Sequence, residues 1–321
     1  MKLKTILITG ASGVIGRLLS FQIINEFKII AIGKDYSRIP EEIRHHKNFK
    51  FYERDFLKIK TPKDLSISEP VDIILHLAGA VSGSKLNESD FFQINAESTK
   101  ILLEFAEKIH CLGIGLASSV SVYGYQNQKL QLESERAGKT VYARSKIEAE
   151  NYLKKSHIPY SIFRIASVYG TGTKSFVSKL FSLYKKGFYP YLKNDPKKSI
   201  IHVEDVAYAL ATWCRKVIAK EKIRTVYVLS HPESVTISQV IGTFHTQRKR
   251  RFKGLGIPIF PVLVPIFNKL AKIKCKLKGI PYHDSPLTPI LQAVEIYDEN
   301  SWKELAIEPK WDLRKGIFPY K

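Results

Sequence analysis

The first half of the chain alternates between two patterns of apolar residues. Short runs in which nearly every residue is apolar, many of them β-branched, are typical of strands buried on both faces of a sheet. Longer segments repeat their apolar residues every three or four positions, as amphipathic helices do. The short runs predict strands over residues 5–9, 29–32, 49–52, 71–77, 113–117 and 160–165, and the longer segments predict helices over residues 14–25, 87–109 and 142–155.

This alternation predicts the fold class. Apolar strands separated by amphipathic helices form a parallel sheet covered on both faces, and right-handed crossovers make it an α/β, doubly wound (Rossmann) sheet. After Gly170 the pattern becomes irregular and rich in proline and lysine, although residues 226–229 predict a strand that returns to the sheet. We therefore predict a dinucleotide-binding domain over residues 1–170 with returning segments at about 200–230, and a smaller, mixed substrate-binding region over about 171–199 and 231–321.

The charge balance adds a further feature. Of the 321 residues, 51 are Lys or Arg and 30 are Asp or Glu, which gives a formal net charge of +21. The segment from Arg248 to Lys278 fits either a solvated basic face or peripheral contact with an anionic membrane. Charge alone supports nucleic-acid binding weakly because no recognised module is visible, so we expect no nucleic-acid partner. Between Ser234 and His283 there is no acidic residue and there are ten basic ones: Arg248, Lys249, Arg250, Arg251, Lys253, Lys269, Lys272, Lys274, Lys276 and Lys278.

Other compositional features bear on location and metals. The longest apolar stretch, residues 257–267, contains three prolines and is too short to span a bilayer, and no long apolar leader follows Lys4. Cys111, Cys214 and Cys275 are far apart, odd in number and without a CxxC pair, which argues against a disulfide framework or a zinc site. We expect no metal and a cytoplasmic location, at the inner face of the membrane if the basic segment binds lipid.

Three glycines interrupt the apolar pattern where the first predicted strand turns into the first predicted helix. They are spaced GxxGxxG in TGASGVIG, at Gly10, Gly13 and Gly16. Gly10 permits the tight turn, Gly13 lets the backbone approach a pyrophosphate, and Gly16 lets helix and strand pack closely. A helix N-terminus here offers backbone N–H groups and the positive end of its dipole to phosphate. The motif therefore predicts dinucleotide binding.

Two further segments carry groups that suit acid–base chemistry. In YARSK, Tyr142 and Lys146 are four residues apart on a predicted helix and share one face. An ammonium near a phenol stabilises the phenolate, so we expect Lys146 to lower the pKa of Tyr142 from about 10 toward neutrality. In ASSVSVYG, serine hydroxyls lie at the end of a predicted strand, where ligands of open parallel sheets bind and a carbonyl oxygen can be hydrogen-bonded.

These elements, in this order, resemble the short-chain dehydrogenase/reductase superfamily, and more closely its extended branch of nucleotide-sugar epimerases, dehydratases and reductases. The resemblance covers nearly the whole chain. Further matching segments are HLAGA at residues 76–80, YERDF around Asp55, the helix asparagine Asn95, FRIASVYG at residues 163–170, IIHVEDVA at residues 200–207 and the closing WKELAIEPKWDLRKGI at residues 302–317.

The resemblance implies roles for the matching residues. Tyr142 gives or removes the hydroxyl proton, Lys146 holds the nicotinamide ribose, and Ser119 supplies the catalytic hydroxyl. Arg164, His202 and Asp205 are favoured as structural links over catalytic groups. The implied cofactor contacts are Gly10, Ser12, Gly13, Val14, Ile15, Gly16, Lys34, Arg38, Asp55, Phe56, Leu77, Ala78, Gly79, Asn95, Tyr142, Lys146 and Ile165.

Two serines are candidate substrate contacts. Ser167 replaces the asparagine that the family usually has near the substrate phosphates. Ser121 would face the same side as Ser119 because side chains alternate along a strand. A rim position for Ser121 without substrate contact stays open.

The cofactor preference is predicted from the turn after the second strand. NAD-selective members of the family usually have Asp there, and this chain has Gly33, which removes the repulsion of a 2′-phosphate. Lys34 and Arg38 could attract that phosphate. We therefore expect NADP to be favoured over NAD, although a shifted turn would let Asp35 take the place of the missing carboxylate.

The resemblance implies hydride transfer at a sugar carbon, in our interpretation C4, of a nucleotide-activated hexose in bacterial surface-polysaccharide precursor synthesis. The sugar 4,6-dehydratases carry an Asp-Glu pair where this chain has Val120 and Ser121, so we expect no 4,6-dehydratase activity. Epimerase and reductase stay open, as do a membrane-associated reductase of steroid-like or lipid-linked substrates and a non-catalytic dinucleotide-binding regulator. The family also implies a homodimer that pairs through the helices around residues 97–110 and 143–156.

Overall fold

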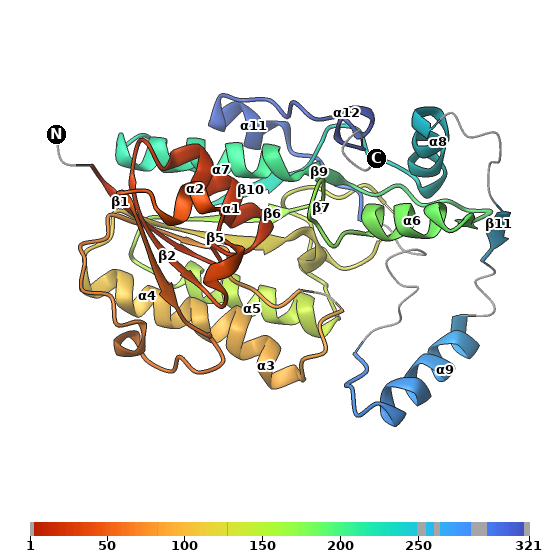
Figure 1. Ribbon diagram of the computed structural model, residues 1–321, viewed down its shortest axis with the longest axis horizontal. Coiled ribbons are helices and arrows are strands. Elements are labelled where there is room, and N and C mark those ends of the chain that lie inside the picture. Colours follow the sequence, from red (N-terminus) through yellow and green to blue (C-terminus); the bar gives the residue numbers. More distant parts are fainter. Residues whose placement is uncertain are drawn as a thin grey trace.

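A seven-stranded sheet forms the centre of the computed structural model, which describes residues 3–81, 83–126, 128–248, 255–259, 264–283 and 294–317 (Figure 1). Every neighbouring pair of strands is parallel, and the strand order is β10-β6-β5-β4-β1-β2-β3. The strands are β1 (Thr5–Thr9), β2 (Lys28–Gly33), β3 (Phe49–Glu53), β4 (Ile73–His76), β5 (Gly113–Ser119), β6 (Tyr160–Ile165) and β10 (Val226–Leu229).

The strand order reverses beside β1. From β1 the chain moves outward to β3, then returns to β4 on the other side of β1 and moves outward again to β6. This is the doubly wound arrangement that the sequence predicts, and β10 extends it at one edge. Ligands of such sheets bind at the carboxyl ends of the strands where the order reverses, which here are the ends of β1 and β4.

Two layers of helices cover the sheet (Figure 1). Because side chains alternate along a strand, Ile6 and Ile8 of β1 join one buried cluster and Leu7 joins another on the opposite face. The helices of the first face are α1 (Val14–Ile23), α7 (Val203–Ile218) and α11 (Glu299–Leu305); those of the second are α3 (Glu88–Phe92), α4 (Ser98–Lys108) and α5 (Val141–Lys154).

The region after β6 is mixed in structure, as predicted. Two small parallel sheets join β7 to β9 and β8 to β11, and a separate apolar cluster includes Leu180, Tyr184 and Phe244. Its elements are β7 (Ser167–Tyr169), α6 (Phe176–Lys185), β8 (Phe188–Tyr191), β9 (Ile200–His202), α8 (Ile237–Arg248), β11 (Leu255–Pro258), α9 (Val264–Leu277) and α12 (Leu313–Ile317).

The structure also changes the boundaries of some predicted elements. The predicted helix over residues 87–109 consists of α3, a π-helical segment η3 (Gln93–Glu97) and α4. The strand predicted over residues 113–117 continues to Ser119 and is followed by a 3₁₀ turn, η4 (Val120–Tyr123). Of the predicted basic segment, residues 249–254 and 260–263 lie outside the described residues. The remaining short elements are η1 (Tyr36–Arg38), α2 (Glu41–Arg44) and η2 (Pro62–Leu65).

Candidate active site

The glycine turn after β1 has room for little but backbone. Gly10 has a φ of +69°, and a Cβ there would lie 2.6 Å from the backbone nitrogen of Ala78. A Cβ at Gly16 would lie 2.6 Å from the carbonyl oxygen of Gly10. Helix α1 starts after Gly13 with no capping side chain from the described residues and no acidic residue in its first turn. Its first N–H groups are thus open to an anion, and the turn fits a dinucleotide pyrophosphate.

Two of the predicted cofactor residues, Lys34 and Asp55, form an ion pair that the sequence did not indicate. Lys34 Nζ lies 2.9 Å from Asp55 Oδ1. Although burial opposes it, this contact and the N–H of Leu57 lower the pKa of the Asp55 carboxyl. Lys34 is therefore shared between a carboxylate and any phosphate that binds there.

The turn after β2 has a structural reason for its glycine. A Cβ at Gly33 would lie 2.8 Å from Oγ of Ser12, in the glycine turn. Asp35 accepts a hydrogen bond of 3.0 Å from the N–H of Ser37 and so caps η1. In this arrangement Asp35 does not replace the carboxylate that is missing at Gly33. The side chain of Arg38 is exposed beside this turn.

Arg17 is a cation that the sequence reasoning missed. It lies in the first half of α1, and its NH1 donates a hydrogen bond of 3.3 Å to the carbonyl oxygen of Arg38. This contact ties α1 to the turn after β2, beside the predicted ribose site. Its only sequence signal is a basic residue one position after Gly16.

Phe56 and Ile165, two other predicted cofactor residues, belong to the core. Phe56 is 4% exposed and packs against His76 with ring centroids 5.6 Å apart. Ile165 is 6% exposed and joins the cluster beneath α1 and α7. Little of either side chain is therefore exposed to a cofactor.

The three predicted catalytic residues meet where β5 ends and α5 begins. Thr140 caps α5 by accepting a hydrogen bond of 3.1 Å from the N–H of Ala143, which places Tyr142 in the first turn. Tyr142 is hydrogen-bonded to Ser119, the last residue of β5. Lys146, one turn later, is buried and donates a hydrogen bond of 2.7 Å to the carbonyl oxygen of Ala117.

The predicted direction of the Tyr142 pKa shift is wrong for these residues as they stand. Burial raises the pKa of Tyr142, and the hydrogen bond from Ser119 lowers it by less. Burial also lowers the pKa of Lys146 to about 8, against the opposing effect of the Glu150 carboxylate. A phenol with a raised pKa is protonated at neutral pH and so has a proton to donate, but a pKa far above the working pH makes it a weaker acid.

Asn95 lies in the π-helical segment and links the segment after β4 to helix α5 by hydrogen bonds. Its Oδ1 accepts a hydrogen bond of 2.8 Å from the N–H of Ala80, and its Nδ2 donates one of 2.9 Å to Oγ of Ser145. A Cβ at Gly79 would lie 3.0 Å from Asn95 Oδ1 and 3.1 Å from Lys146 Nζ. Segments of π-helix often mark functional sites, and this one brings α4, α5 and the end of β4 together.

A buried histidine, to which sequence reasoning assigned no role, joins the two strands at the switch point. His76 Nδ1 lies 2.6 Å from Oγ1 of Thr9, and its Nε2 lies 2.9 Å from Oγ of Ser98. Burial, with a smaller effect from the Lys146 charge, lowers the pKa of His76 to about 3. The imidazole therefore stays neutral and holds the ends of β1 and β4 against α4.

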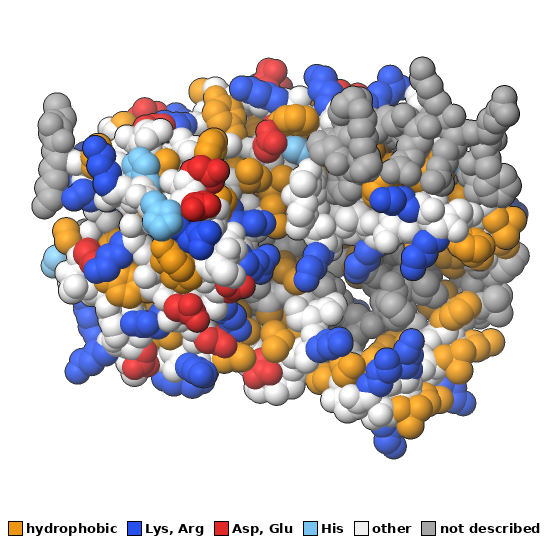
Figure 2. Space-filling model, viewed as in Figure 1, with side chains coloured by type: hydrophobic (Ala, Val, Ile, Leu, Met, Phe, Trp, Pro, Cys, Tyr) orange, Lys and Arg blue, Asp and Glu red, His pale blue; other side chains and the backbone are white. Residues whose placement is uncertain are grey.

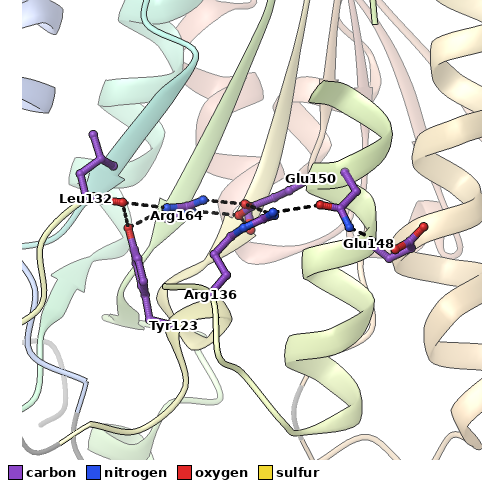
Figure 3. A network of polar contacts seen from close by, with 8 residues as sticks. Tyr123, Leu132, Arg136, Glu148, Glu150 and Arg164 are labelled. Carbon is purple, nitrogen blue, oxygen red and sulfur yellow. Dashed lines mark hydrogen bonds and ion pairs between the residues drawn. The ribbon is translucent and has the colours of Figure 1, made fainter. Parts of the chain in front are cut away.

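Glu150 is a further group that the sequence reasoning missed (Figure 3). This fully buried carboxylate on α5 accepts hydrogen bonds of 2.7 Å from Ser118 Oγ, 2.7 Å from Arg164 NH2 and 3.2 Å from Arg136 NH1. Arg164 NH1 also donates to the Tyr123 hydroxyl at 2.7 Å. The network fixes α5, which carries Tyr142 and Lys146, against β5 and β6.

Arg164, Asp205 and His202 have the contacts of structural links. Arg164 belongs to the Glu150 network. Asp205 accepts hydrogen bonds of 2.9 Å and 3.1 Å from the N–H groups of Lys310 and Trp311. His202 stacks on Trp311 with ring centroids 4.5 Å apart. These contacts agree with the structural role favoured from the sequence.

The two predicted substrate serines differ in their surroundings. Ser121 does not continue β5, so the argument from strand alternation is wrong: it lies in η4, and its N–H donates to Ser119 Oγ at 3.2 Å. Its own hydroxyl is buried and finds no hydrogen-bond partner among the described residues. Ser167 is partly exposed at the start of β7, where it pairs with Ile200.

The family model for the NAD dependent epimerase/dehydratase family matches residues 6–229, which span the glycine turn, Ser119, Tyr142 and Lys146. The chain belongs to this family. The resemblance inferred from the motifs is thereby confirmed. The members of this family are NAD(P)-dependent enzymes of the extended short-chain dehydrogenase/reductase type.

Several curated relatives match parts of this chain. An uncharacterised protein of Methanocaldococcus jannaschii is 30% identical over 53% of this chain and 58% of its own length. A UDP-glucose 4-epimerase of Cyamopsis tetragonoloba is 28% identical over 46% of this chain and 45% of its own. A sterol-4-alpha-carboxylate 3-dehydrogenase of Candida albicans is 25% identical over 68% and 66%. The chain spans about half the length of the first two.

Solved structures share the fold over nearly the whole chain. A UDP-glucuronic acid 4-epimerase from Bacillus cereus in complex with NAD superposes with a TM-score of 0.76 at 18% identity, covering 98% of this chain and 96% of that one. A dTDP-glucose 4,6-dehydratase from Bacillus anthracis in complex with NAD gives 0.74 at 20% identity, covering 98% and 94%. One fold thus serves both reactions, and identities this low show the fold alone.

Proposed function

We propose that the protein transfers hydride between a bound nicotinamide dinucleotide and C4 of a nucleotide-activated hexose, as an epimerase or a reductase in bacterial surface-polysaccharide precursor synthesis. The observation that carries the proposal is the meeting of Ser119, Tyr142 and Lys146 at the sheet edge that also holds the glycine turn. The 4-epimerases among the relatives and the solved structures support the choice of C4.

The proposed chemistry divides between cofactor and protein. When bound, the nicotinamide supplies or accepts the hydride. The protonated phenol of Tyr142 gives its proton to the C4 oxygen as hydride reaches C4 during reduction, and in the reverse direction the phenolate that this step leaves takes the proton of the C4 hydroxyl. Ser119 hydrogen-bonds the same oxygen and stabilises the negative charge that develops there. Lys146, held by the Ala117 carbonyl, presents its ammonium to the cofactor ribose and to the phenolate.

The first test compares two tyrosines on one helix. Tyr142→Phe removes the proposed proton donor and should lower turnover by about 10²–10⁴-fold, because a positioned acid contributes that much. Tyr152→Phe removes a hydroxyl from the same helix that donates 2.8 Å to Glu97, and it should leave turnover unchanged. The assay follows C4 inversion, or NAD(P)H formation as the C4 hydroxyl is oxidised, with UDP-glucose, UDP-N-acetylglucosamine and UDP-glucuronic acid. Full turnover by the Tyr142→Phe protein would refute the assignment.

The absence of 4,6-dehydratase activity stays part of the proposal. Elimination of water needs an acid and a base, and neither Val120, which is buried, nor the Ser121 hydroxyl can supply them at neutral pH. Mass spectrometry of a dTDP-glucose or UDP-glucose incubation is the test. Formation of a product lighter by one water would overturn this point.

We also propose that NADP binds more tightly than NAD. Gly33 presents no carboxylate to a 2′-phosphate, Asp35 is engaged by Ser37, and Arg38 is exposed beside the turn. Calorimetric titration of both cofactors should show tighter NADP binding. Arg38→Gln should weaken NADP binding and spare NAD, and tighter NAD binding by the unaltered protein would refute the preference.

A second candidate function is oxidation or reduction of a steroid-like or lipid-linked substrate. The exposed apolar helix α9 and the sterol dehydrogenase relative favour it. Turnover of a sterol or polyprenyl-linked sugar but not of soluble UDP-sugars would select this candidate. A purely regulatory dinucleotide-binding role is disfavoured because a sensor has no use for the Ser119, Tyr142 and Lys146 set. The domain division and the homodimer stay predictions.

A further inference from the structure

Helix α9 presents a stripe of large apolar side chains to solvent. Ile266, Leu270, Ile273 and Leu277 follow one another at helical spacing and lie on one face. They are 56%, 58%, 48% and 82% exposed, and Phe267 beside them is 50% exposed. A soluble surface rarely groups large apolar side chains in this way unless the patch contacts a partner.

The opposite face of α9 shows that the stripe points away from the rest of the described chain. Val264, Asn268, Ala271 and Cys275 also recur at helical spacing, and each is partly covered. The side that faces the protein therefore carries mostly small residues, whereas the larger apolar side chains face outward. The helix is thus amphipathic, but its large apolar face points to solvent, whereas a helix that covers a core turns that face inward.

Lysines border the apolar stripe. Lys274 lies at one edge, and Lys269, Lys272 and Lys276 lie at the other by helical geometry, all of them exposed. Figure 2 shows lysine and hydrophobic side chains side by side on the lobe that α9 forms, with no acidic side chain among them. The sequence from Ser234 to His283 contains no Asp or Glu at all. The charge of the surface is therefore complementary to an anionic one.

The described residues on either side attach α9 to the protein. Before it, β11 pairs in parallel with β8. After it, His283 Nε2 donates a hydrogen bond of 2.6 Å to the carbonyl oxygen of Leu86, and its ring packs edge-on against Phe91 of α3. Since α3 leads into the segment that carries Asn95, the helix is attached beside the candidate active site.

We propose that α9 is a membrane-docking helix, which lies in the headgroup region of an anionic bilayer with Ile266, Leu270 and Leu277 inserted. An in-plane helix needs an apolar face flanked by Lys or Arg, and α9 has both. No helix among the described residues is long and apolar enough to cross a bilayer. The docking goes beyond the proposed reaction and holds whichever sugar or lipid the enzyme converts.

Vesicle co-sedimentation of the full chain tests the charge requirement. The protein should sediment with vesicles of phosphatidylcholine and phosphatidylglycerol at low salt, less at high salt, and not with phosphatidylcholine alone. The triple variant Lys269→Gln, Lys272→Gln, Lys276→Gln should bind on the order of a hundredfold more weakly, since each lysine near an anionic surface contributes about fivefold. Its matched control is Lys28→Gln, Lys63→Gln, Lys222→Gln, which removes the same charge from exposed sites elsewhere and should bind as the unaltered chain does.

A second pair of measurements isolates the apolar stripe. The double variant Leu270→Gln, Leu277→Gln should lose anionic-vesicle binding while its thermal unfolding midpoint stays that of the unaltered chain. Equal losses in the two lysine triples, or no binding of the unaltered protein to anionic vesicles at low salt, would overturn the proposal. Self-association abolished by the leucine variant, without vesicle binding, would assign the stripe to a second copy of the chain and also overturn it.

Discussion

The candidate active site and helix α9 hold their charges in opposite ways. At the site, Lys146 and Glu150 are buried, and each has its partner among atoms of neighbouring strands. On α9, all of which the structure describes, no residue is buried and the lysines project into solvent. The first region has its electrostatics fixed by the fold, whereas the second presents charge to something outside it.

Because of this difference, substitutions in the two regions should affect different properties of the protein. A buried charge that loses its partner pays the full cost of being out of water, so substitutions at the site should act on the stability of the protein. An exposed charge interacts weakly through water, so substitutions on α9 should act on docking and leave the free energy of unfolding nearly unchanged. Matched substitutions in the two regions can therefore test whether their charges are held in these two ways.

Removal of the buried carboxylate should have the largest effect. Glu150→Ala leaves the Arg164 and Arg136 cations without the group that pairs them, and breaking a buried pair costs about 3–5 kcal/mol. The control is Glu148→Ala on the same helix, whose carboxylate accepts a hydrogen bond from Asn151. Guanidinium unfolding of both variants measures the difference. Equal stability of the two would show that the network does not hold α5 in place.

Two left-handed glycines provide the next comparison. Gly10 has φ +69° and a hypothetical Cβ 2.6 Å from the Ala78 backbone, whereas Gly279, just after α9, has φ +60° and no described atom within 4 Å of its Cβ position. Gly10→Ala should cost roughly 2–4 kcal/mol, from the backbone strain and the clash, and should weaken dinucleotide binding. Gly279→Ala should cost only about 1 kcal/mol, from the strain. Unfolding curves and cofactor titration check both, and an equal cost would deny the tight packing of the glycine turn.

Local patterns predicted much of the molecule. The strands of the sheet, the glycine turn and the Tyr142–Lys146 pair could be found because each depends on residues within one or two turns of chain. Even the return of β10 to the sheet was predicted, since an apolar β-branched run has few other places to go. The family motifs then brought Ser119 to the same site.

Long-range pairings could not be predicted in this way. Glu150 finds Arg164 only because α5 packs across β5 and β6, and His76 finds Thr9 only because β1 and β4 are neighbours in the sheet. The shift of the Tyr142 pKa was predicted in the wrong direction because burial raises this pKa by more than the hydrogen bond from Ser119 lowers it. Sequence spacing does not report burial. Ser121 was misplaced because β5 ends at Ser119, two residues earlier. Ser121 lies in the turn η4 that follows, which has no distinctive sequence signal.

Acid should destabilise the protein through its buried histidine. The pKa of His76 is about 3 in the folded chain, and an unfolded histidine titrates near 6.5. Below about pH 6.5 the unfolded chain binds a proton that the folded chain excludes, so stability is full above that pH and is lost as the pH falls toward 3. At pH 5 the loss from this one group is about 2 kcal/mol.

Unfolding free energies measured between pH 7 and pH 5 test the histidine effect. His76→Gln should flatten the dependence on pH, whereas His157→Gln, at an exposed site on the loop after α5, should leave it unchanged. His202, whose pKa burial lowers to about 4, contributes with the same sign and accounts for part of what remains. A His76→Gln protein with an unaltered pH dependence would contradict the neutral, buried imidazole.

The smallest effect is expected on the outward face of α9. Leu270→Ala removes a side chain that is 58% exposed, so the free energy of unfolding in solution should change by less than about 0.5 kcal/mol. Leu102→Ala, on α4, removes one that is 0% exposed and should cost about 2–5 kcal/mol. Parallel guanidinium unfolding of the two variants makes the comparison. A loss of more than about 1 kcal/mol at Leu270 would mean that the stripe packs against the protein itself, and α9 would then stabilise the fold in the same way as the helices around the sheet.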